Sequence, residues 1–114
     1  EALRLVKFSA VGMCCLERGY LFDISSPTKV VEFVSLDVPV VVNGQPDQAR
    51  IVRESGAGIA TGDTVEEFAR AVLEVLEHRD RYVGRGRAYI ARERDYRVMS
   101  GSIVRVLESL RRRR

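Results

Sequence analysis

Three consecutive valines, Val40-Val41-Val42, limit the fold more than any other part of the sequence. Pro39 precedes them and Asn43-Gly44 follows, so the run is short and sharply bounded. A strand that is apolar on both faces fits a sheet covered on both sides, which is typical of parallel sheets. Because parallel strands need a crossover connection, usually a helix, we expect strands and helices to alternate around this run.

Two further strands and a helix can be placed around the valines. Ala10–Leu16 reads as a buried strand followed by a loop, and Gly58–Thr61 reads as a third, weaker strand. Asp47–Ser55 is predicted to be a helix, with Pro46 near its start and Gly56 at its C-terminal end. This order indicates an α/β chain with a parallel β-α-β-α-β unit, one half of a doubly wound, Rossmann-like sheet, followed by C-terminal helices.

The last part of the chain is predicted to be helical. An amphipathic helix is capped by Asp63 or Thr64, and a shorter helix covers Arg87–Arg94. A final helix over Val98–Leu110 is expected to pack against the rest of the domain. The apolar faces consist of Phe68, Val72, Leu73 and Leu76 in the first of these helices and of Ile103, Val104, Leu107 and Leu110 in the last.

The helix before the valines begins at a Ser26-Pro27-Thr28-Lys29 run. Proline is tolerated at the first helical position, so Ser26 is the expected N-cap and Thr28 and Lys29 lie in the first turn. The unpaired N–H groups of that turn, the helix dipole and the Lys29 ammonium suit a phosphate or a carboxylate. An ordinary capped helix is the simpler alternative. However, ligands of such sheets bind beyond the carboxyl ends of the strands, where this helix begins, and that favours a binding site.

These residues belong to an ordered series that resembles the nucleotide-sugar-binding half of a retaining glycosyltransferase of the GT-B fold, group 1 (family 4). The likeness runs from Ala10 to Leu110, nearly the whole chain. The series consists of Ser26-Pro27-Thr28-Lys29, Glu32-Phe33, Asp37, Pro39-Val40-Val41 and, further on, Glu54-Ser55-Gly56-Ala57-Gly58.

The resemblance implies a role for each residue at the helix start. In the family, backbone N–H groups at the matching position hold the diphosphate of the donor, and the glutamate that matches Glu32 hydrogen-bonds the nucleotide ribose. Glu32 lies one turn beyond Thr28 on the same flank of the helix. Ser26 and Thr28 are expected to add hydroxyl donors, and Lys29 a positive charge.

The sequence departs from the family at one position of this motif. The family places a second glutamate eight residues before the one that matches Glu32, and Ile24 stands there instead. Asp23 is the only nearby acid, and we expect it to contact the donor sugar in part, although local turn chemistry explains such an aspartate equally well. We identify no catalytic residue, and we expect no cofactor besides the nucleotide-diphosphate sugar that serves as donor substrate.

The resemblance assigns residues 1–110 to part of a donor-binding domain and residues 111–114 to a basic tail. The family's acceptor-binding first domain and the first strands of its donor domain have no counterpart here. We therefore expect this chain by itself not to transfer sugar, and we expect the missing N-terminal domain to be its partner. A sheet that lacks half its strands also exposes an edge, which favours self-association.

The net charge of +3 owes much to Arg111–Arg114, without which the balance is slightly acidic. Such a run attracts an anionic lipid surface or nucleic acid, or is simply solvated. Because no basic stripe with interleaved aromatic residues accompanies it, we expect no nucleic-acid partner. The family type implies a cytoplasmic enzyme, with peripheral contact to the inner membrane face. Cys14 and Cys15 are expected to be buried, and their spacing with His78 does not suggest a metal site.

Two other classes of protein remain alternatives. One is a non-catalytic nucleotide-binding α/β module, which would bind the nucleotide strongly without transferring a sugar. The other is a flavodoxin-like or response-regulator-like signalling domain. The first strand lacks the acidic cluster that a phosphate-accepting signalling domain needs, so the sequence favours the glycosyltransferase resemblance first and the binding module second.

Overall fold

The computed structural model describes residues 1–113. Its elements follow one another in the order α1 (Ala2–Lys7), β1 (Gly12–Cys14), α2 (Tyr20–Asp23), α3 (Thr28–Ser35), β2 (Val40–Val42), α4 (Pro46–Ser55), β3 (Gly58–Ala60), α5 (Val65–Glu77), the 3-10 helix η1 (Arg79–Arg81), α6 (Gly86–Glu93) and α7 (Tyr96–Arg111).

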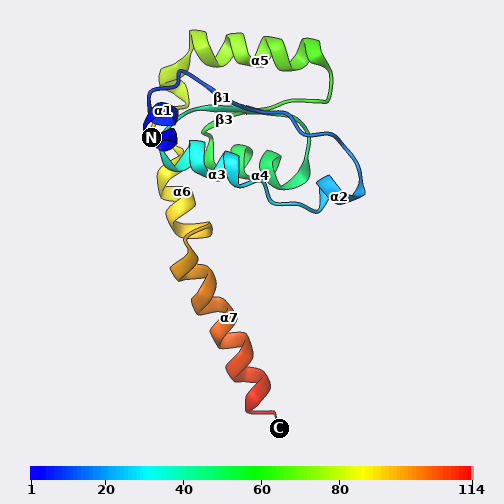
Figure 1. Cartoon of the computed structure of the whole chain (residues 1–114), viewed down its shortest axis with the longest axis vertical. Helices are drawn as coiled ribbons and strands as arrows, with labels where there is room; N and C mark the ends of the chain where they lie inside the picture. Colours follow the sequence, from blue (N-terminus) through cyan, green and yellow to red (C-terminus); the bar gives the residue numbers. More distant parts are fainter. Residues whose placement is uncertain (114) are drawn as a thin grey trace.

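The three strands form one parallel sheet in the order β1-β2-β3, with Val40 level with Gly12 on one side and with Gly58 on the other. Both crossovers lead to the next strand in the same direction, so α3 and α4 lie on the same face of the sheet, and α5 covers the opposite face (Figure 1). The predicted α/β class and the parallel β-α-β-α-β order are confirmed, and the arrangement is compatible with a partial Rossmann-like fold.

The valines of β2 form the centre of the molecule, and each of them is fully buried. Val40 and Val42 face α3, α4 and α6, whereas Val41 faces α5, as the alternation of side chains along a strand requires. The core on the α3 side consists of Val30, Val34, Val40, Val42, Ile51, Val52, Ala57, Tyr89 and Ile90.

The predicted ends of α4 and α5 are confirmed in detail. Pro46 is the first residue of α4, and Gly56 ends that helix in the left-handed conformation, with φ of 68°. Thr64 is the N-cap of α5, where its hydroxyl accepts the N–H of Glu67 while the Glu67 carboxylate accepts the N–H of Thr64. These local signals fix where the two helices begin and end.

Three expectations were wrong in whole or in part. The loop after β1 contains the short helix α2. The predicted face of α5 is half right: Phe68 and Val72 pack against the buried Val41, Ala71 and Val75, whereas Leu73 and Leu76 stay exposed. Small and β-branched residues allow the helix to approach the sheet closely, so the longer leucines lie outside the contact. The third error concerns α7, which contacts α6 at its start and buries none of its residues, so it is not a packing helix within this chain.

Both outer strands of the sheet have one side without a strand partner among residues 1–113, since β1 and β3 each pair only with β2. Over the same residues, none of the helices combines the length and the apolar character that a transmembrane span requires.

Candidate functional site

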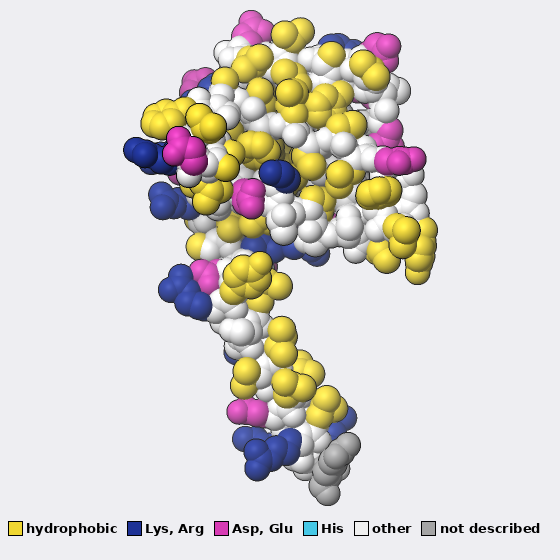
Figure 2. Space-filling model, viewed as in Figure 1, with side chains coloured by type: hydrophobic (Ala, Val, Ile, Leu, Met, Phe, Trp, Pro, Cys, Tyr) yellow, Lys and Arg dark blue, Asp and Glu magenta, His cyan; other side chains and the backbone are white. Residues whose placement is uncertain are grey.

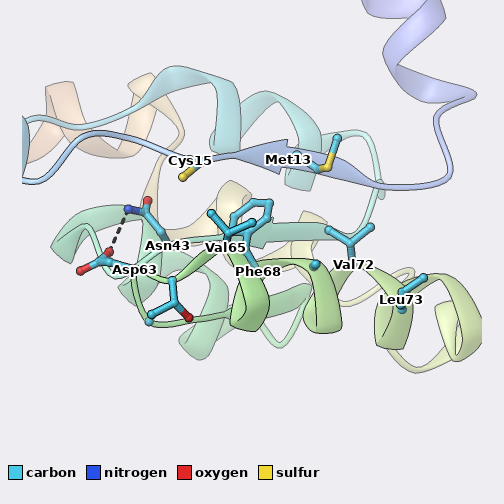
Figure 3. Close-up of a pocket in the computed structure, with 11 residues that line it drawn as sticks. Met13, Cys15, Asn43, Asp63, Val65, Phe68, Val72 and Leu73 are labelled. Carbon is cyan, nitrogen blue, oxygen red and sulfur yellow. Dashed lines mark hydrogen bonds between the residues drawn. The ribbon is translucent and has the colours of Figure 1, made fainter.

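The loops that follow the three strands come together at the carboxyl edge of the sheet. Arg18, in the loop after β1, pairs with Asp63, which follows β3, at 3.0 Å between Nη1 and Oδ2. Asn43, directly after β2, donates from Nδ2 to Asp63 Oδ1 at 3.0 Å (Figure 3). Because a crossover helix runs antiparallel to the strands it joins, α3 begins at this same edge.

The first turn of α3 has no side-chain cap. Pro27, with φ of −69° and ψ of 114°, occupies the N-cap position, and it has no side-chain oxygen that could accept a backbone N–H. The prediction that Ser26 caps this helix was therefore wrong. By contrast, α4, α5 and α7 are each capped by a side chain, from Gln45, Thr64 and Asp95 respectively.

Ser26 instead belongs to a small charged cluster. Its hydroxyl donates to Asp47 Oδ2 at 2.7 Å, and Asp47 also receives Arg94 Nη2 at 2.6 Å and Arg50 Nη2 at 2.9 Å. Burial alone would raise the pKa of the Asp47 carboxyl, but the hydrogen bonds from Arg94 and Ser26 outweigh it and the pKa is lowered. α3 begins at Thr28, so Ser26 stands one residue before the N-cap position, and its hydroxyl is engaged with Asp47.

Asp23 is held by an arginine on the same edge. Arg18 Nε donates to Asp23 Oδ1 at 2.8 Å, and Nη2 donates to Oδ2 at 3.2 Å. The hydrogen bonds from Arg18 lower the pKa of Asp23, so this carboxylate is ionised at neutral pH. Asp23 and Ser26 both line a cleft of about 330 Å³ with Ser25, Pro46, Asp47, Arg50 and Arg94.

Thr28, Lys29 and Glu32 lie on α3 and are exposed to solvent. The pKa of the thiol of Cys14, the last residue of β1, is raised by burial and by the neighbouring Cys15. The positive charge of Lys29 acts in the opposite direction and lowers this pKa. Lys29 therefore lies near the carboxyl end of β1. Within residues 1–113, the side chains of Lys29 and Glu32 form no ion pair, so both are available to a ligand.

Three buried amide side chains hold the loop after β1 in place, and the sequence reading did not identify them. Asn43 accepts the N–H of Leu16 at 3.0 Å and donates to the Leu16 carbonyl at 2.7 Å. Gln45 donates from Nε2 to the carbonyls of Phe22 and Ser25, each at 2.8 Å.

Gln48 completes the set by donating to Asn43 Oδ1 at 2.7 Å. Three amides within six residues of the valine strand were the available signal, because amides buried beside a sheet usually bind a neighbouring backbone. Their effect is to fix the path of the chain that leads into α3.

A second concavity lies on the other face of the sheet, between β1 and α5, with a volume of about 490 Å³. Met13 of β1 and Cys15, which directly follows that strand, line one side of this groove, and Phe68 and Leu73 of α5 line the other (Figure 3). The expectation that both cysteines are buried was wrong, since Cys14 is half-buried and Cys15 is exposed. Adjacent side chains of a strand point to opposite faces, and α5 packs mainly on β2 and β3, leaving this side of β1 open.

The five predicted residues thus fall into two neighbouring groups. Thr28, Lys29 and Glu32 surround the uncapped start of α3, and Asp23 and Ser26 line the cleft beside it. No group of three or more metal-ligating side chains occurs in the part of the chain that the structure describes. Searches of protein families, of curated proteins and of solved structures found nothing that matches this chain.

Proposed function

We propose that this chain is the nucleotide-sugar-binding portion of a retaining glycosyltransferase of the GT-B type. The observation that carries the proposal is the start of α3, an uncapped and exposed helix N-terminus at the carboxyl edge of a parallel sheet, with Lys29 in its first turn and Glu32 one turn later. The resemblance of the Ser26–Phe33 motif to the family supports it.

Each residue has a role that its chemistry suits. The N–H groups of the first turn of α3 and the Lys29 ammonium bind the diphosphate, because unpaired amides and the helix dipole favour anions. The Glu32 carboxylate accepts two ribose hydroxyls at once. When the glycosidic bond to the diphosphate breaks, the same amides stabilise the charge that develops on the leaving group.

Asp23 and Ser26 are proposed to contact the sugar side of the donor. Asp23 is hydrogen-bonded to Arg18, and Ser26 is hydrogen-bonded to Asp47, which in turn pairs with Arg94. A sugar hydroxyl that contacts Asp23 or Ser26 would therefore have to share each of them with its present partner. We propose that transfer requires the acceptor-binding domain of the family. The chain by itself binds the donor and does not turn it over.

The test is calorimetric titration of the chain with UDP and with GDP. We expect one of the two to bind, and the matching monophosphate to bind more weakly because it lacks the second phosphate. Glu32→Gln weakens binding by about 10- to 100-fold, the range expected when a hydrogen bond to a charged group is lost. Glu66→Gln is the matched control, because Glu66 is exposed in the first turn of α5 and lies on the other face of the sheet.

Two results would contradict the proposal. One is the absence of binding of both diphosphates at millimolar concentration to a chain whose circular dichroism shows it folded. The other is binding that Glu32→Gln and Glu66→Gln change equally, because the site would then lie away from α3.

A further inference from the structure

The cleft beside the start of α3 has an isoleucine among its charged residues. Ile24, the C-cap residue of α2, lines the cleft and is 69% exposed. Figure 2 shows hydrophobic side chains on the surface at the end of the body where Figure 1 places α2. The cleft volume of about 330 Å³ lies at the lower end of the range of about 300–1,000 Å³ found for small-molecule sites, so it suits a single sugar unit.

The backbone around Ile24 is held in place from both sides. A single exposed isoleucine is ordinary on a protein surface and needs no explanation by itself. Here, however, the buried Gln45 donates from Nε2 to the carbonyls of Phe22 and Ser25, each at 2.8 Å. Asp23, which lies between these two residues, is fixed by two hydrogen bonds from an arginine. Ile24 is therefore a preorganised apolar contact for a ligand of the cleft.

The charged side chains that line the cleft balance one another. They are two aspartates, Asp23 and Asp47, and two arginines, Arg50 and Arg94. Asp47 is paired with both arginines, and Asp23 is paired with Arg18. A further anion in the cleft would face both carboxylates, so the lining favours an uncharged sugar over a uronic acid or a sugar phosphate.

Most polar groups of the lining already have partners, and Arg50 is the exception. The hydroxyl of Ser26 donates to Asp47, and the hydroxyl of Ser25 donates to the carbonyl of Phe22. Within residues 1–113, Arg50 makes one hydrogen bond, from Nη2 to Asp47 Oδ1 at 2.9 Å, and its side chain is 59% exposed. The remaining N–H groups of this guanidinium can donate to an acceptor on a ligand.

A donor beside an apolar contact matches an acetamido group, in which a carbonyl acceptor adjoins a methyl group. Pro46, one turn before Arg50 on α4, adds a second apolar surface to the lining. We propose that the donor sugar is an N-acetylhexosamine, with its acetyl methyl against Ile24 and Pro46 and its carbonyl accepting from Arg50. A 6-deoxy sugar also carries a methyl group, but it offers no acceptor in its place and fits less well.

This placement of the sugar rests on the proposed function. Ser26, which lines the cleft, directly precedes the N-cap residue of α3. A sugar linked to a diphosphate at the start of α3 therefore has the cleft next to it.

Calorimetric titration with three UDP sugars tests the inference. We expect UDP-N-acetylglucosamine to bind about tenfold more tightly than UDP-glucose, because the acetamido group adds a methyl contact and a hydrogen bond from a charged donor. UDP-glucuronic acid, whose sugar is anionic, binds no more tightly than UDP-glucose.

Two variants with matched controls assign the preference to the cleft. Ile24→Ala and Arg50→Gln each reduce the ratio of the affinities for UDP-N-acetylglucosamine and UDP-glucose by about three- to tenfold. Leu21→Ala on α2 and Arg53→Gln on α4 change exposed residues that do not line the cleft, so they leave the ratio unchanged. Because both ligands share the UDP moiety, a general loss of stability does not alter this ratio.

A methyl resonance locates the acetyl group. In a chain with ¹³C-labelled isoleucine methyl groups, the δ-methyl signal of Ile24 is assigned by its loss in Ile24→Ala. This signal shifts more with UDP-N-acetylglucosamine than with UDP-glucose or UDP.

Three results would overturn this inference and leave the proposed function intact. They are equal affinity for UDP-N-acetylglucosamine and UDP-glucose, tightest binding of UDP-glucuronic acid, and equal effects of the variants and their controls. Binding of GDP but not of UDP would do the same, since N-acetylhexosamines are activated as UDP derivatives. Absence of binding of every nucleotide would overturn both the inference and the proposed function.

Discussion

Asn43 is the residue on which the geometry of the candidate site depends most, and replacing it with alanine tests that dependence. Its side chain is 3% exposed, and it joins the end of β2 to Leu16 in the loop after β1. The same side chain accepts a hydrogen bond from Gln48. Asn43→Ala removes these bonds and leaves the Leu16 N–H and carbonyl without their partner.

The expected cost follows from the bonds that are lost. The two bonds to Leu16 and the bond from Gln48 contribute about 1 kcal/mol each, so their removal lowers the free energy of unfolding by about 3 kcal/mol. The bond to Asp63 adds little, because that carboxylate is partly exposed and water replaces the amide. A loss of this size is a large part of the roughly 5–15 kcal/mol that stabilises a domain.

Urea unfolding followed by circular dichroism measures the loss, and hydrogen exchange locates it at the Leu16 amide. The control is Ser35→Ala, which removes an exposed hydroxyl bonded to the Glu32 carbonyl and costs less than about 0.5 kcal/mol. If Asn43→Ala costs less than about 1 kcal/mol and the exchange of Leu16 is unchanged, the amide does not hold the loop and this reasoning fails.

Further predictions concern the cluster around Asp47 and the packing of α6. The folded pKa of Asp47 lies below its unfolded value, so its contribution to stability is present above about pH 4 and is lost as the pH falls through the folded pKa. Arg94→Met therefore makes the free energy of unfolding fall less steeply between pH 5 and 3. A slope equal to that of the wild-type chain would contradict this prediction. Gly86→Ala places a Cβ only 3.0 Å from the Val34 carbonyl oxygen and lowers the melting temperature, since overpacking costs about 1–3 kcal/mol. Gly101→Ala, whose Cβ meets nothing closer than 3.8 Å, does not lower it, and equal effects of the two would refute the packing argument.

The parts of the fold that depend on local chemistry could be predicted from the sequence. Val40-Val41-Val42 marks a strand buried on both faces, and Gly56 and Thr64 mark helix ends, because strand burial and capping are decided by residues close together in the chain. The α/β order followed from these elements.

Features that depend on distant partners could not be predicted in this way. Ser26 donates to Asp47, which is 21 residues away in the sequence, and the helix that Ser26 was predicted to cap begins one residue later than expected. The apolar spacing of the residues in α7 is visible in the sequence, but an amphipathic pattern does not say whether the helix packs on its own domain or on another surface. The exposure of Cys15 could not be predicted either, because it depends on how much of the sheet α5 covers.

The central claim is that a nucleoside diphosphate binds at the start of α3. Backbone amide resonances of the ¹⁵N-labelled chain, followed during titration with UDP and with GDP, test it most directly. We predict that the amide resonances of Thr28, Lys29 and Val30 shift more than any others and that their shifts saturate at one common nucleotide concentration. We also predict that Glu32→Gln reduces these shifts. Shifts confined to the groove between β1 and α5, or no shifts at millimolar nucleotide, would contradict it.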